Sequence, residues 1–341
     1  MSLLPFLHRA AAGENLSLEQ AHEAMTVLLE GRASEAAMAG FLVALRMKGE
    51  TATELAGFAQ AMREKSVFVD AAPDVIDIVG TGGDEAGTFN ISTVAAIILA
   101  GAGVRVAKHG NRAISGRVGS ADVLEALGVR IALTPEEAVR AIREIGLGFL
   151  FAPHLHPAMK HAQAVRRELK MRTAFNLLGP LANPARAQYQ LIGAASTKAA
   201  HIMAEALSQL GTAHSFVVHG FLSAHAGLDE ISTVGSTHVF EVWTGRVEKH
   251  VWTPEDFGIP RATLAELAGG DAAENAAIIR AVLAGEAGAR RDIAVLNAAA
   301  ALMVCGKANT PREAVEVAAA SVDSGRAAKV LAKLHEHFPA A

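Results

Sequence analysis

Cysteine is almost absent from this sequence, since Cys305 is the only one among 341 residues. A single cysteine cannot build a disulfide framework, which favours a reducing cytosol, and we interpret Cys305 as a small buried hydrophobic residue. An excess of basic residues is absent too: the formal net charge is −4, which argues against a nucleic-acid coat protein. No run approaches the roughly 20 apolar residues of a membrane span. The apolar run at residues 3–7 lacks the basic start of an export signal, so we expect a cytoplasmic protein.

Hydrophobic residues are abundant instead and make up 51% of the chain. That share, over this length, allows a large core and predicts two domains rather than one. Residues 3–66 carry apolar side chains at helical spacing, with a capping box at residues 17–20. From Val75 onward, β-rich runs alternate with helical segments, a pattern typical of a mostly parallel sheet. We expect strands at residues 75–79, 104–107, 148–151, 189–193 and 215–219.

A helical, basic stretch interrupts this alternation at residues 156–188 and ends in Gly-Pro and Asn-Pro turns. We assign this stretch to the helical domain. The predicted protein is therefore of the α/β class, with a small all-helical domain and a larger α/β domain built on a mostly parallel central sheet. The helical domain comprises residues 1–70 and the excursion 156–188, and the α/β domain comprises residues 71–155 and 189–341.

The most informative stretch is a glycine-rich loop at residues 80–88, between the first predicted strand and a helix expected to begin near Asn90 or Ser92. Glycines permit positive φ angles and a close approach of the backbone to a ligand. The unpaired N–H groups and the positive dipole end of the helix point at the same loop. A phosphate or pyrophosphate group suits such a cradle. A tight turn without a ligand is the less favoured interpretation, because three of the four residues 80–83 are glycine.

Two well-known glycine loops do not match this spacing. The dinucleotide-binding pattern needs a third glycine where Glu85 stands, and the Walker pattern needs a Gly-Lys-Ser/Thr that does not follow. A dinucleotide-dependent oxidoreductase is therefore the weakest of the functions considered.

A second polar loop follows the next predicted strand. Residues 108–117 contain Lys108, Arg112 and Arg117, interleaved with glycine and serine, and a helix is expected to open at Ser120. Clustered cations suit an oxyanion of high charge, although a solvated basic loop would have the same composition. Both loops lie at the carboxyl ends of predicted parallel strands, where open sheets bind their ligands.

These loops belong to a series of motifs that closely resembles the anthranilate phosphoribosyltransferase family, which catalyses the second dedicated step of tryptophan biosynthesis. The resemblance spans nearly the whole chain, and the number and order of the motifs make it specific. The motifs are Gly-Thr-Gly-Gly-Asp at 80–84, Asn-Ile-Ser-Thr at 90–93, Lys-His-Gly-Asn-Arg at 108–112, Gly-Ser-Ala-Asp-Val-Leu-Glu at 119–125, His-Pro-Ala-Met-Lys at 156–160, Arg-Thr-Ala-Phe-Asn-Leu-Leu-Gly-Pro-Leu-Ala-Asn-Pro at 172–184 and Asp-Glu-Ile-Ser at 229–232.

The resemblance implies a reaction cleft between the two domains and a homodimer formed through the helical domain. The implied reaction transfers the phosphoribosyl group of 5-phosphoribosyl 1-pyrophosphate to the amine of anthranilate, with no nucleic-acid or membrane partner. The residues implied to contact the donor are Gly80, Gly83, Asp84, Thr88, Asn90, Ile91, Ser92, Thr93, Lys108, His109, Gly110, Asn111, Arg112, Ala113, Ile114, Ser115, Gly116 and Ser120.

The resemblance also implies the remaining roles. The implied ligands of two Mg²⁺ ions per chain are Ser92, Asp229 and Glu230. The anthranilate carboxylate and ring would be held by Asn111 and Arg166, with the path lined by His109, His156, Gly179 and Pro180. The implied catalytic residues are His109, Asn111 and Arg166, and His109 is a candidate acceptor for the proton that the amine loses.

The residue types suit these roles chemically. Carboxylate and hydroxyl oxygens suit Mg²⁺, which also takes phosphate oxygens as ligands. Side chains of adjacent residues diverge, so Asp229 and Glu230 could each serve a different ion. The Arg166 guanidinium can pair with a carboxylate through two hydrogen bonds, although a plain surface charge is the alternative. We expect displacement at ribose C1 with inversion, driven by positioning and electrostatic stabilisation.

Two departures from the family pattern bear on these assignments. The segment at residues 219–227 is longer than the usual His-Gly-x-x-Gly turn, which affects the position of the acidic pair. Ala164 stands where a proline often precedes the Val-Arg pair, which affects the helix that carries Arg166.

Two alternative functions remain open from the sequence. A nucleoside phosphorylase has a similar two-domain fold and binds ribose and phosphate, but the acidic pair and the glycine-rich loop favour a metal-pyrophosphate donor. A non-catalytic, nucleic-acid-binding relative of the family should have a basic surface, whereas this chain is acidic.

Overall fold

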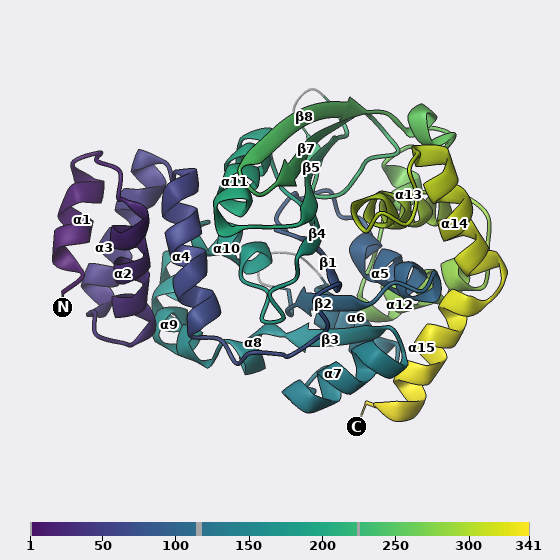
Figure 1. Ribbon diagram of the computed structural model, residues 1–341, viewed down its shortest axis with the longest axis horizontal. Helices are drawn as coiled ribbons and strands as arrows, with labels where there is room; N and C mark the ends of the chain where they lie inside the picture. Colours follow the sequence, from purple (N-terminus) through teal and green to yellow (C-terminus); the bar gives the residue numbers. More distant parts are fainter. Residues whose placement is uncertain (1, 114–117, 224–225, 341) are drawn as a thin grey trace.

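The computed structural model describes residues 2–113, 118–223 and 226–340. A bundle of N-terminal helices lies at one side of an α/β body (Figure 1). The bundle contains α1 (Leu4–Ala11), α2 (Leu18–Leu29), α3 (Glu35–Lys48) and α4 (Ala52–Glu64), with α9 (Lys160–Leu169) and α10 (Phe175–Leu181) packed beside them. Distant segments of the chain thus build one helical unit, because α9 contacts α2 and α3 while α10 contacts α4.

Polar side chains fix the starts of the bundle helices. Ser17 begins α2 with the capping box that the sequence predicted, and α4 begins with a second capping box that includes Glu54. Glu54 is completely buried and accepts hydrogen bonds from the Leu16 N–H at 2.9 Å and the Lys48 ammonium at 2.8 Å. This carboxylate joins three segments of the bundle, because each segment supplies it with a donor.

The central sheet has eight strands in the order β3-β2-β1-β4-β5-β7-β8, with β6 beside β5. Strands β1 to β5 are parallel, whereas β6, β7 and β8 are antiparallel. The strands are β1 (Ile76–Gly80), β2 (Val106–Gly110), β3 (Leu147–Phe151), β4 (Tyr189–Gly193), β5 (His214–Phe221), β6 (Gly227–Leu228), β7 (Thr237–Trp243) and β8 (Arg246–Trp252). The predicted class is confirmed: a small helical domain accompanies a larger α/β domain with a mostly parallel sheet. The antiparallel strands were not predicted, because they follow one another as hairpins instead of alternating with helices.

Two hydrophobic cores lie on opposite faces of this sheet. Helices α5 (Ile91–Gly101) and α13 (Ala289–Val304) cover one face, where Ile78 and Phe216 are buried. Helix α11 (Thr197–Leu210) covers the other face, where Val217 and Phe240 share a core with the helical bundle. The remaining helices are α6 (Ser120–Ala126), α7 (Pro135–Glu144), α8 (Ala152–Leu155), α12 (Ala272–Leu283), α14 (Pro311–Asp323) and α15 (Arg326–His337), with short 3₁₀ turns at Pro157–Met159 (η1), Pro254–Phe257 (η2) and Ala265–Leu267 (η3).

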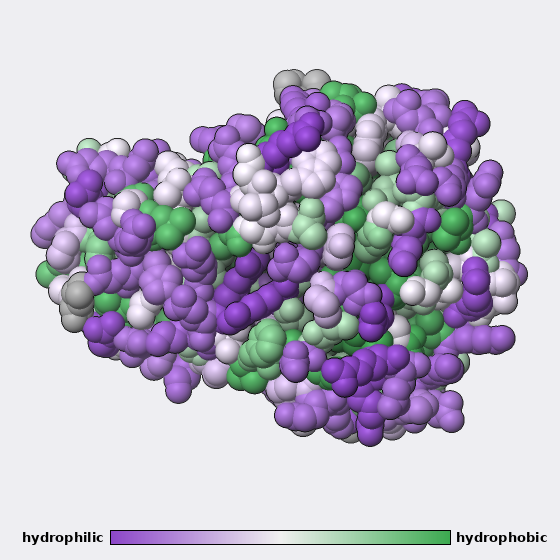
Figure 2. Space-filling model, viewed as in Figure 1, coloured by the Kyte–Doolittle hydropathy of each residue, from purple (hydrophilic) through white to green (hydrophobic). Residues whose placement is uncertain are grey.

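The outer surface is mostly hydrophilic on the face shown in Figure 2, where hydrophobic side chains form small, separate groups. Within the described ranges, no helix combines the length and the apolar composition that crossing a membrane would require.

The second predicted strand differs in position from the observed one. Strand β2 runs from Val106 to Gly110, so Lys108 and His109 lie on a buried strand and not on a loop, as the sequence predicted. The prediction ended this strand too early, because a charged residue rarely continues a buried strand. Lys108 is accommodated because its ammonium donates to the Ile78 carbonyl at 2.6 Å.

Candidate active site

The acidic pair crosses the carboxyl edge of the parallel sheet. Gly80 ends β1 and Gly193 ends β4, and the two are direct neighbours in the sheet. A Cβ atom on Gly193 would lie 1.6 Å from the Asp229 carbonyl oxygen, and one on Gly80 would lie 2.2 Å from an Asp229 carboxylate oxygen. Glycine is required at both strand ends, because the chain passes directly over them.

Asp229 and Glu230 point at the two ends of the glycine-rich loop. The Asp229 carboxylate accepts a hydrogen bond from the Gly82 N–H at 2.7 Å. The Glu230 carboxylate accepts one from the Ser92 N–H at 2.9 Å, in the first turn of α5. Asp84 lies beside them and accepts from the Asp229 N–H at 3.3 Å. Carboxylate oxygens therefore occupy positions where the loop and helix N–H groups bind negative charge.

The acidic pair is fixed on both sides. Before it, the longer segment noted in the sequence continues β5 to Phe221 and returns as β6, with Gly227 opposite Phe221. After it, the Asn297 amide accepts from the Ile231 N–H at 2.9 Å and donates to the Ile231 carbonyl at 3.0 Å. Asn297 is buried on α13 and was not predicted as a site residue, because nothing in its sequence position shows which strand end it faces.

Negative charge exceeds positive charge at this edge of the sheet. Burial and repulsion by Asp84 raise the pKa of Asp229, and burial and repulsion by Asp229 raise the pKa of Glu230. Lys108 attracts both carboxylates, while its own burial lowers the pKa of its ammonium. Hard oxygen donors with unbalanced negative charge fit a divalent cation such as Mg²⁺.

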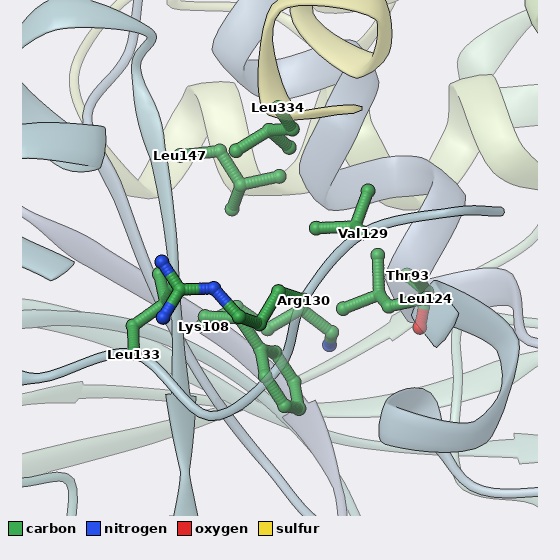
Figure 3. Close-up of a pocket in the computed structure, with 9 residues that line it drawn as sticks. Thr93, Lys108, Leu124, Val129, Arg130, Leu133, Leu147 and Leu334 are labelled. Carbon is green, nitrogen blue, oxygen red and sulfur yellow. The ribbon is translucent and has the colours of Figure 1, made fainter. Parts of the chain in front are cut away.

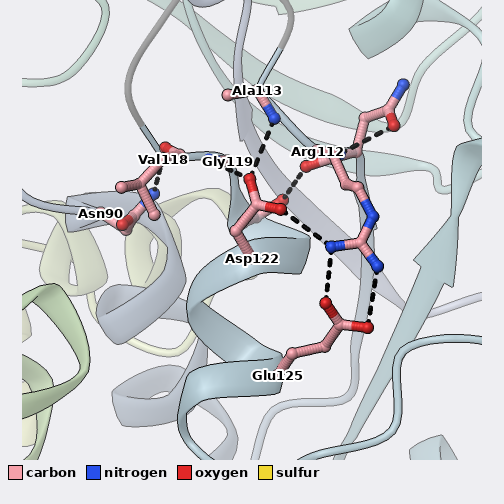
Figure 4. Close-up of polar contacts among 9 residues, drawn as sticks. Asn90, Arg112, Ala113, Val118, Gly119, Asp122 and Glu125 are labelled. Carbon is pink, nitrogen blue, oxygen red and sulfur yellow. Dashed lines mark hydrogen bonds and ion pairs between the residues drawn. The ribbon is translucent and has the colours of Figure 1, made fainter. Parts of the chain in front are cut away.

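The second loop is held to α6 by acidic side chains (Figure 4). The Arg112 guanidinium donates to Asp122 at 2.9 Å and to Glu125 at 2.8 Å. Asp122 also accepts from the N–H groups of Ala113 at 3.1 Å and Gly119 at 2.8 Å. The charge of Arg112 is already paired, so its predicted contact with the donor would require this pairing to break. The predicted contacts Ile114, Ser115 and Gly116 lie outside the described residues.

Two buried histidines lie side by side, with 5.1 Å between the ring centroids of His109 and His156. The Nδ1 atom of His109 lies 3.1 Å from the Gly179 carbonyl, and His156 hydrogen bonds to the Ala182 carbonyl. Neither Nε2 atom has a partner in the described part of the chain, so each is free to accept a hydrogen bond. Burial lowers the pKa of His109 to about 3 and that of His156 to about 4, which keeps both rings neutral at pH 7.

A buried carboxylate on β1 supports this part of the site. Asp77 accepts from the His109 N–H at 3.1 Å and from the Asn183 amide at 2.7 Å. The same amide donates to the Ala107 carbonyl at 2.9 Å. Burial raises the pKa of Asp77 to about 6, although the Asn183 hydrogen bond and the charge of Lys108 limit the rise. Asp77 was not predicted as a site residue, and the signal for it was an acidic residue within an apolar strand.

Two arginines of the excursion, Arg166 and Arg172, were part of the sequence motifs and have different surroundings. Arg166 lies over the Phe175 ring at 5.0 Å, and burial lowers its pKa without a compensating carboxylate among the described residues. Helix α9 runs without a break through Ala164, so the missing proline does not interrupt it. Arg172 donates to the Gly82 carbonyl at 2.8 Å and so links the excursion to the glycine-rich loop. Its motif was visible in the sequence, but this role was not predicted.

The other predicted residues lie along the same edge or just inside it. Ile91 and Thr93 are buried in α5, and their N–H groups donate to the Phe89 carbonyl at 2.8 Å and the Asn90 carbonyl at 3.1 Å. Thr88 forms an isolated bridge with Ala268. Gly83 has a φ angle of 73°, Gly110 ends β2 and Ser120 begins α6. Asn90 donates to the Val118 carbonyl, and the Asn111 side chain accepts from the Arg112 N–H. The carbonyl of Pro180, in α10, accepts from the Gln190 amide.

A small cavity below this edge is not the substrate site (Figure 3). It has a volume of about 10 Å³, and its lining includes the stem of Lys108, Leu124, Val129 and Leu334. Such a space holds one water molecule at most, and its walls are apolar.

Comparison with known proteins shows what this arrangement is similar to. Residues 4–66 match the helical bundle domain of the glycosyl transferase family, and residues 72–328 match its a/b domain. An anthranilate phosphoribosyltransferase of Solibacter usitatus is 54% identical over 336 residues, which cover 97% of this chain and 98% of the relative.

Solved structures agree with the sequence relatives. Anthranilate phosphoribosyltransferase from Thermus thermophilus has a TM-score of 0.90 and 44% identity, over 96% of this chain and 98% of that chain. The Saccharomyces cerevisiae enzyme in complex with PRPP and Mg has a TM-score of 0.87 and 29% identity, over 98% of this chain and 97% of that chain. The same yeast enzyme in complex with 4-fluoroanthranilate has a TM-score of 0.86 and 29% identity, over 98% of this chain and 96% of that chain.

We expect the two buried histidines to make the protein less stable in acid. The unfolded chain takes up protons on histidine near pH 6.5, whereas the folded pKa is about 3 for His109 and about 4 for His156. Falling pH therefore favours the unfolded chain from about pH 6.5 downward. Between pH 6.5 and pH 5, each histidine should lower the free energy of unfolding by on the order of 1.5 kcal/mol, and replacing both with glutamine should remove this loss. Urea unfolding at both pH values measures the difference, and parallel profiles for variant and wild type would contradict it.

Proposed function

This chain belongs to the anthranilate phosphoribosyltransferase family, and on that premise we propose that it transfers the phosphoribosyl group of 5-phosphoribosyl 1-pyrophosphate to the amine of anthranilate. The products are N-(5-phosphoribosyl)anthranilate and pyrophosphate, in a step of tryptophan biosynthesis. The observation that carries the proposal is the acidic pair, whose carboxylates accept from the N–H groups of Gly82 and Ser92. A metal-bound pyrophosphate is the ligand that both the acids and these N–H groups would bind.

The pyrophosphate of the donor would bind between the glycine-rich loop and the start of α5. Gly82 and Gly83 have φ angles of 68° and 73°, a backbone conformation that turns successive N–H groups toward one side. The Lys108 ammonium lies 3.4 Å from the Ser92 hydroxyl and adds a positive charge below this cradle. Fixed dipoles and a buried cation would stabilise the charge that develops on the leaving pyrophosphate.

Two Mg²⁺ ions would be held by Ser92, Asp229 and Glu230. Asp229 and Glu230 contact different elements, the Gly82 N–H and the Ser92 N–H, so each carboxylate would serve its own ion. Bound Mg²⁺ would neutralise part of the pyrophosphate charge and so make it a better leaving group. The donor's own oxygens would complete the coordination, as is usual for this ion.

Anthranilate would bind beside the histidines, with its carboxylate on Arg166 and Asn111. Arg166 is a largely buried cation that finds no carboxylate among the described residues, and the substrate would supply one through two hydrogen bonds. The aromatic amine is already unprotonated at pH 7, so no strong base is required. Its nitrogen forms the new bond to ribose C1 as the bond to pyrophosphate breaks, with inversion. The proton then released would pass to a neutral acceptor, and the candidate is the Nε2 atom of His109, which has no partner among the described residues.

The two alternatives from the sequence have less support. A nucleoside phosphorylase binds inorganic phosphate, for which carboxylates facing the anion cradle would be repulsive unless a metal ion lies between them. Phosphorolysis of a nucleoside without Mg²⁺ would favour that alternative. A nucleic-acid-binding relative would carry a basic surface, whereas this chain has a net charge of −4.

The chain would form a homodimer through its helical bundle and would work in the cytosol. Met47 on α3 is 82% exposed and Leu4 on α1 is 47% exposed, and these two helices pack against each other. Large apolar side chains exposed on neighbouring helices are typical of an interaction surface. The cytosolic location is supported by the single cysteine of the sequence.

Removing the acidic pair should abolish the reaction. We expect Asp229→Ala/Glu230→Ala to lower kcat/KM by at least about 100-fold, because the leaving pyrophosphate loses its electrostatic stabilisation. The decay of anthranilate fluorescence with PRPP and Mg²⁺ measures the rate. The matched control is Glu255→Ala/Asp256→Ala, which removes two consecutive acidic residues on η2 and should keep wild-type activity. The proposed function would be wrong if the folded wild-type protein consumed no anthranilate.

Removing the charge of Arg166 should weaken the binding of anthranilate without weakening that of PRPP. Arg166→Met is expected to raise KM for anthranilate by roughly 10- to 100-fold, since a charged hydrogen-bond pair contributes about 1.5–3 kcal/mol. KM for PRPP should stay within about twofold. The neighbouring Arg167 is exposed, so Arg167→Met is the matched control. Equal changes in both KM values would argue that Arg166 supports the cleft without binding anthranilate.

A charge at the exposed apolar surface of the bundle should separate the dimer. We expect wild type to have the mass of two chains in light scattering after size exclusion, and Met47→Glu to shift toward one chain. Leu264→Glu introduces the same charge at a residue that is 37% exposed beside η3 and should leave the mass unchanged. A monomeric wild type at micromolar concentration would be evidence against the interface.

A further inference from the structure

A second group of metal-ligand side chains is assembled at the antiparallel end of the sheet. We call it the β7–β8 cluster and define it as His214, Glu241, Glu248 and His250. One ligand atom each of Glu241, Glu248 and His250 lies within 4.8 Å of the others, and the described ranges contain no second group of this kind. His214 joins the cluster through its Nε2 atom, which lies 2.7 Å from a Glu241 carboxylate oxygen.

The register of the sheet places these side chains on one face. Glu241 on β7 pairs with Phe216 of β5 on one side and with Glu248 of β8 on the other. His214 lies two residues before Phe216, and His250 lies two residues after Glu248. Side chains alternate between the faces with a period of two, so all of them project from the same face. The three ligand residues therefore come together from the adjacent strands β7 and β8, and His214 of β5 contacts Glu241 from the other side.

The two imidazole rings approach different oxygens of the Glu241 carboxylate. Both ring nitrogens of His214 have partners, because Nδ1 lies 3.0 Å from the Val304 carbonyl and Nε2 lies 2.7 Å from Glu241. The Nε2 atom of His250 is buried, lies 2.9 Å from the other Glu241 oxygen and makes no hydrogen bond. A ring nitrogen and a carboxylate oxygen this close without a hydrogen bond leave room for a positive charge between them, which a metal ion would supply.

We propose that the β7–β8 cluster binds one divalent transition-metal ion of the zinc class. Imidazole and carboxylate are both zinc ligands, at distances of about 2.0–2.2 Å in a tetrahedral site. One oxygen of Glu248 accepts from Arg246 at 2.9 Å, which leaves the second oxygen for the ion. His214 would orient the Glu241 carboxylate through its hydrogen bond of 2.7 Å, as residues behind a metal ligand usually do. One ion would satisfy the His250 ring and both carboxylates at once, while His214 holds the other oxygen of Glu241.

This site is distinct from the acidic pair at the other end of the same strand. His214 begins β5, whereas Gly220, which contacts the Glu230 backbone, lies six residues further along the strand. At about 3.3 Å per residue the two ends are roughly 20 Å apart. The ion would connect β7 to the outermost strand β8, so its role is structural.

Titration of wild type with Zn²⁺ in the presence of millimolar Mg²⁺ tests the proposal. Mg²⁺ occupies sites made of oxygen and competes poorly for imidazole, so it masks the acidic pair. Isothermal titration calorimetry should show about one Zn²⁺ per chain, and the melting temperature should rise with Zn²⁺. Ni²⁺ gives an independent signal, because the sequence has two tryptophans, Trp243 and Trp252, both on the antiparallel strands. Trp243 stacks on His214 at 5.2 Å and 6°, so bound Ni²⁺ should quench its fluorescence.

Variants separate this site from adventitious binding. His250→Gln and Glu241→Gln should each weaken Zn²⁺ binding by more than about tenfold and lose the quenching. His22→Gln is the matched control, because His22 is 30% exposed and pairs with a single carboxylate, while His250 is 37% exposed. Circular dichroism of the metal-free variants checks their folding. The proposal is overturned if wild type takes up no stoichiometric Zn²⁺, if the two cluster variants bind like wild type, or if Asp229→Ala/Glu230→Ala abolishes the binding instead.

Discussion

The passage of residues 229–230 over the glycine ends of β1 and β4 is the constraint on which the active site depends. A side chain on Gly80 or Gly193 would occupy the space of the passing chain, so the crossing requires glycine. Because the chain crosses there, Asp229 reaches the glycine-rich loop and Glu230 reaches the first turn of α5. One short stretch of backbone thus brings acidic groups to two anion-binding elements that parallel strands place at a common edge.

The charges below that edge explain why it is suited to a metal-bound anion. Lys108 interacts with Asp77 and with both residues of the acidic pair, and its single positive charge cannot balance three carboxylates. Buried charges are costly unless they are paired, which favours binding of a further cation at the exposed end of the group. His109 and His156 stay neutral because burial lowers their pKa to about 3 and about 4. The site therefore combines a charged half for the donor with an uncharged, accepting half for an amine.

The two halves belong to different layers of the molecule. The acidic pair is attached to the sheet, whereas Arg166 lies on α9, which packs against α2 and α3 of the helical bundle. The hydrogen bond from Arg172 to the Gly82 carbonyl connects these layers at the glycine-rich loop. Helix α11 also connects these layers, because its buried residues belong to the same hydrophobic core as those of the bundle. The position of the acceptor side relative to the donor side thus depends on packing between segments that are far apart in the chain.

The sequence by itself determined the fold class, the five parallel strands, the two polar loops and the family, because apolar periodicity, capping residues and glycine spacing act within a few residues. It did not determine that Lys108 lies inside a strand, or that Arg112 is paired with Asp122 and Glu125, because these outcomes depend on neighbouring elements. The β7–β8 cluster is the clearest case. His214 and Glu241 are 27 residues apart, and only the antiparallel register of β5 and β7 brings them within 2.7 Å. Tertiary structure decided these contacts, since strand pairing joins residues whose local sequence carries no mark of each other.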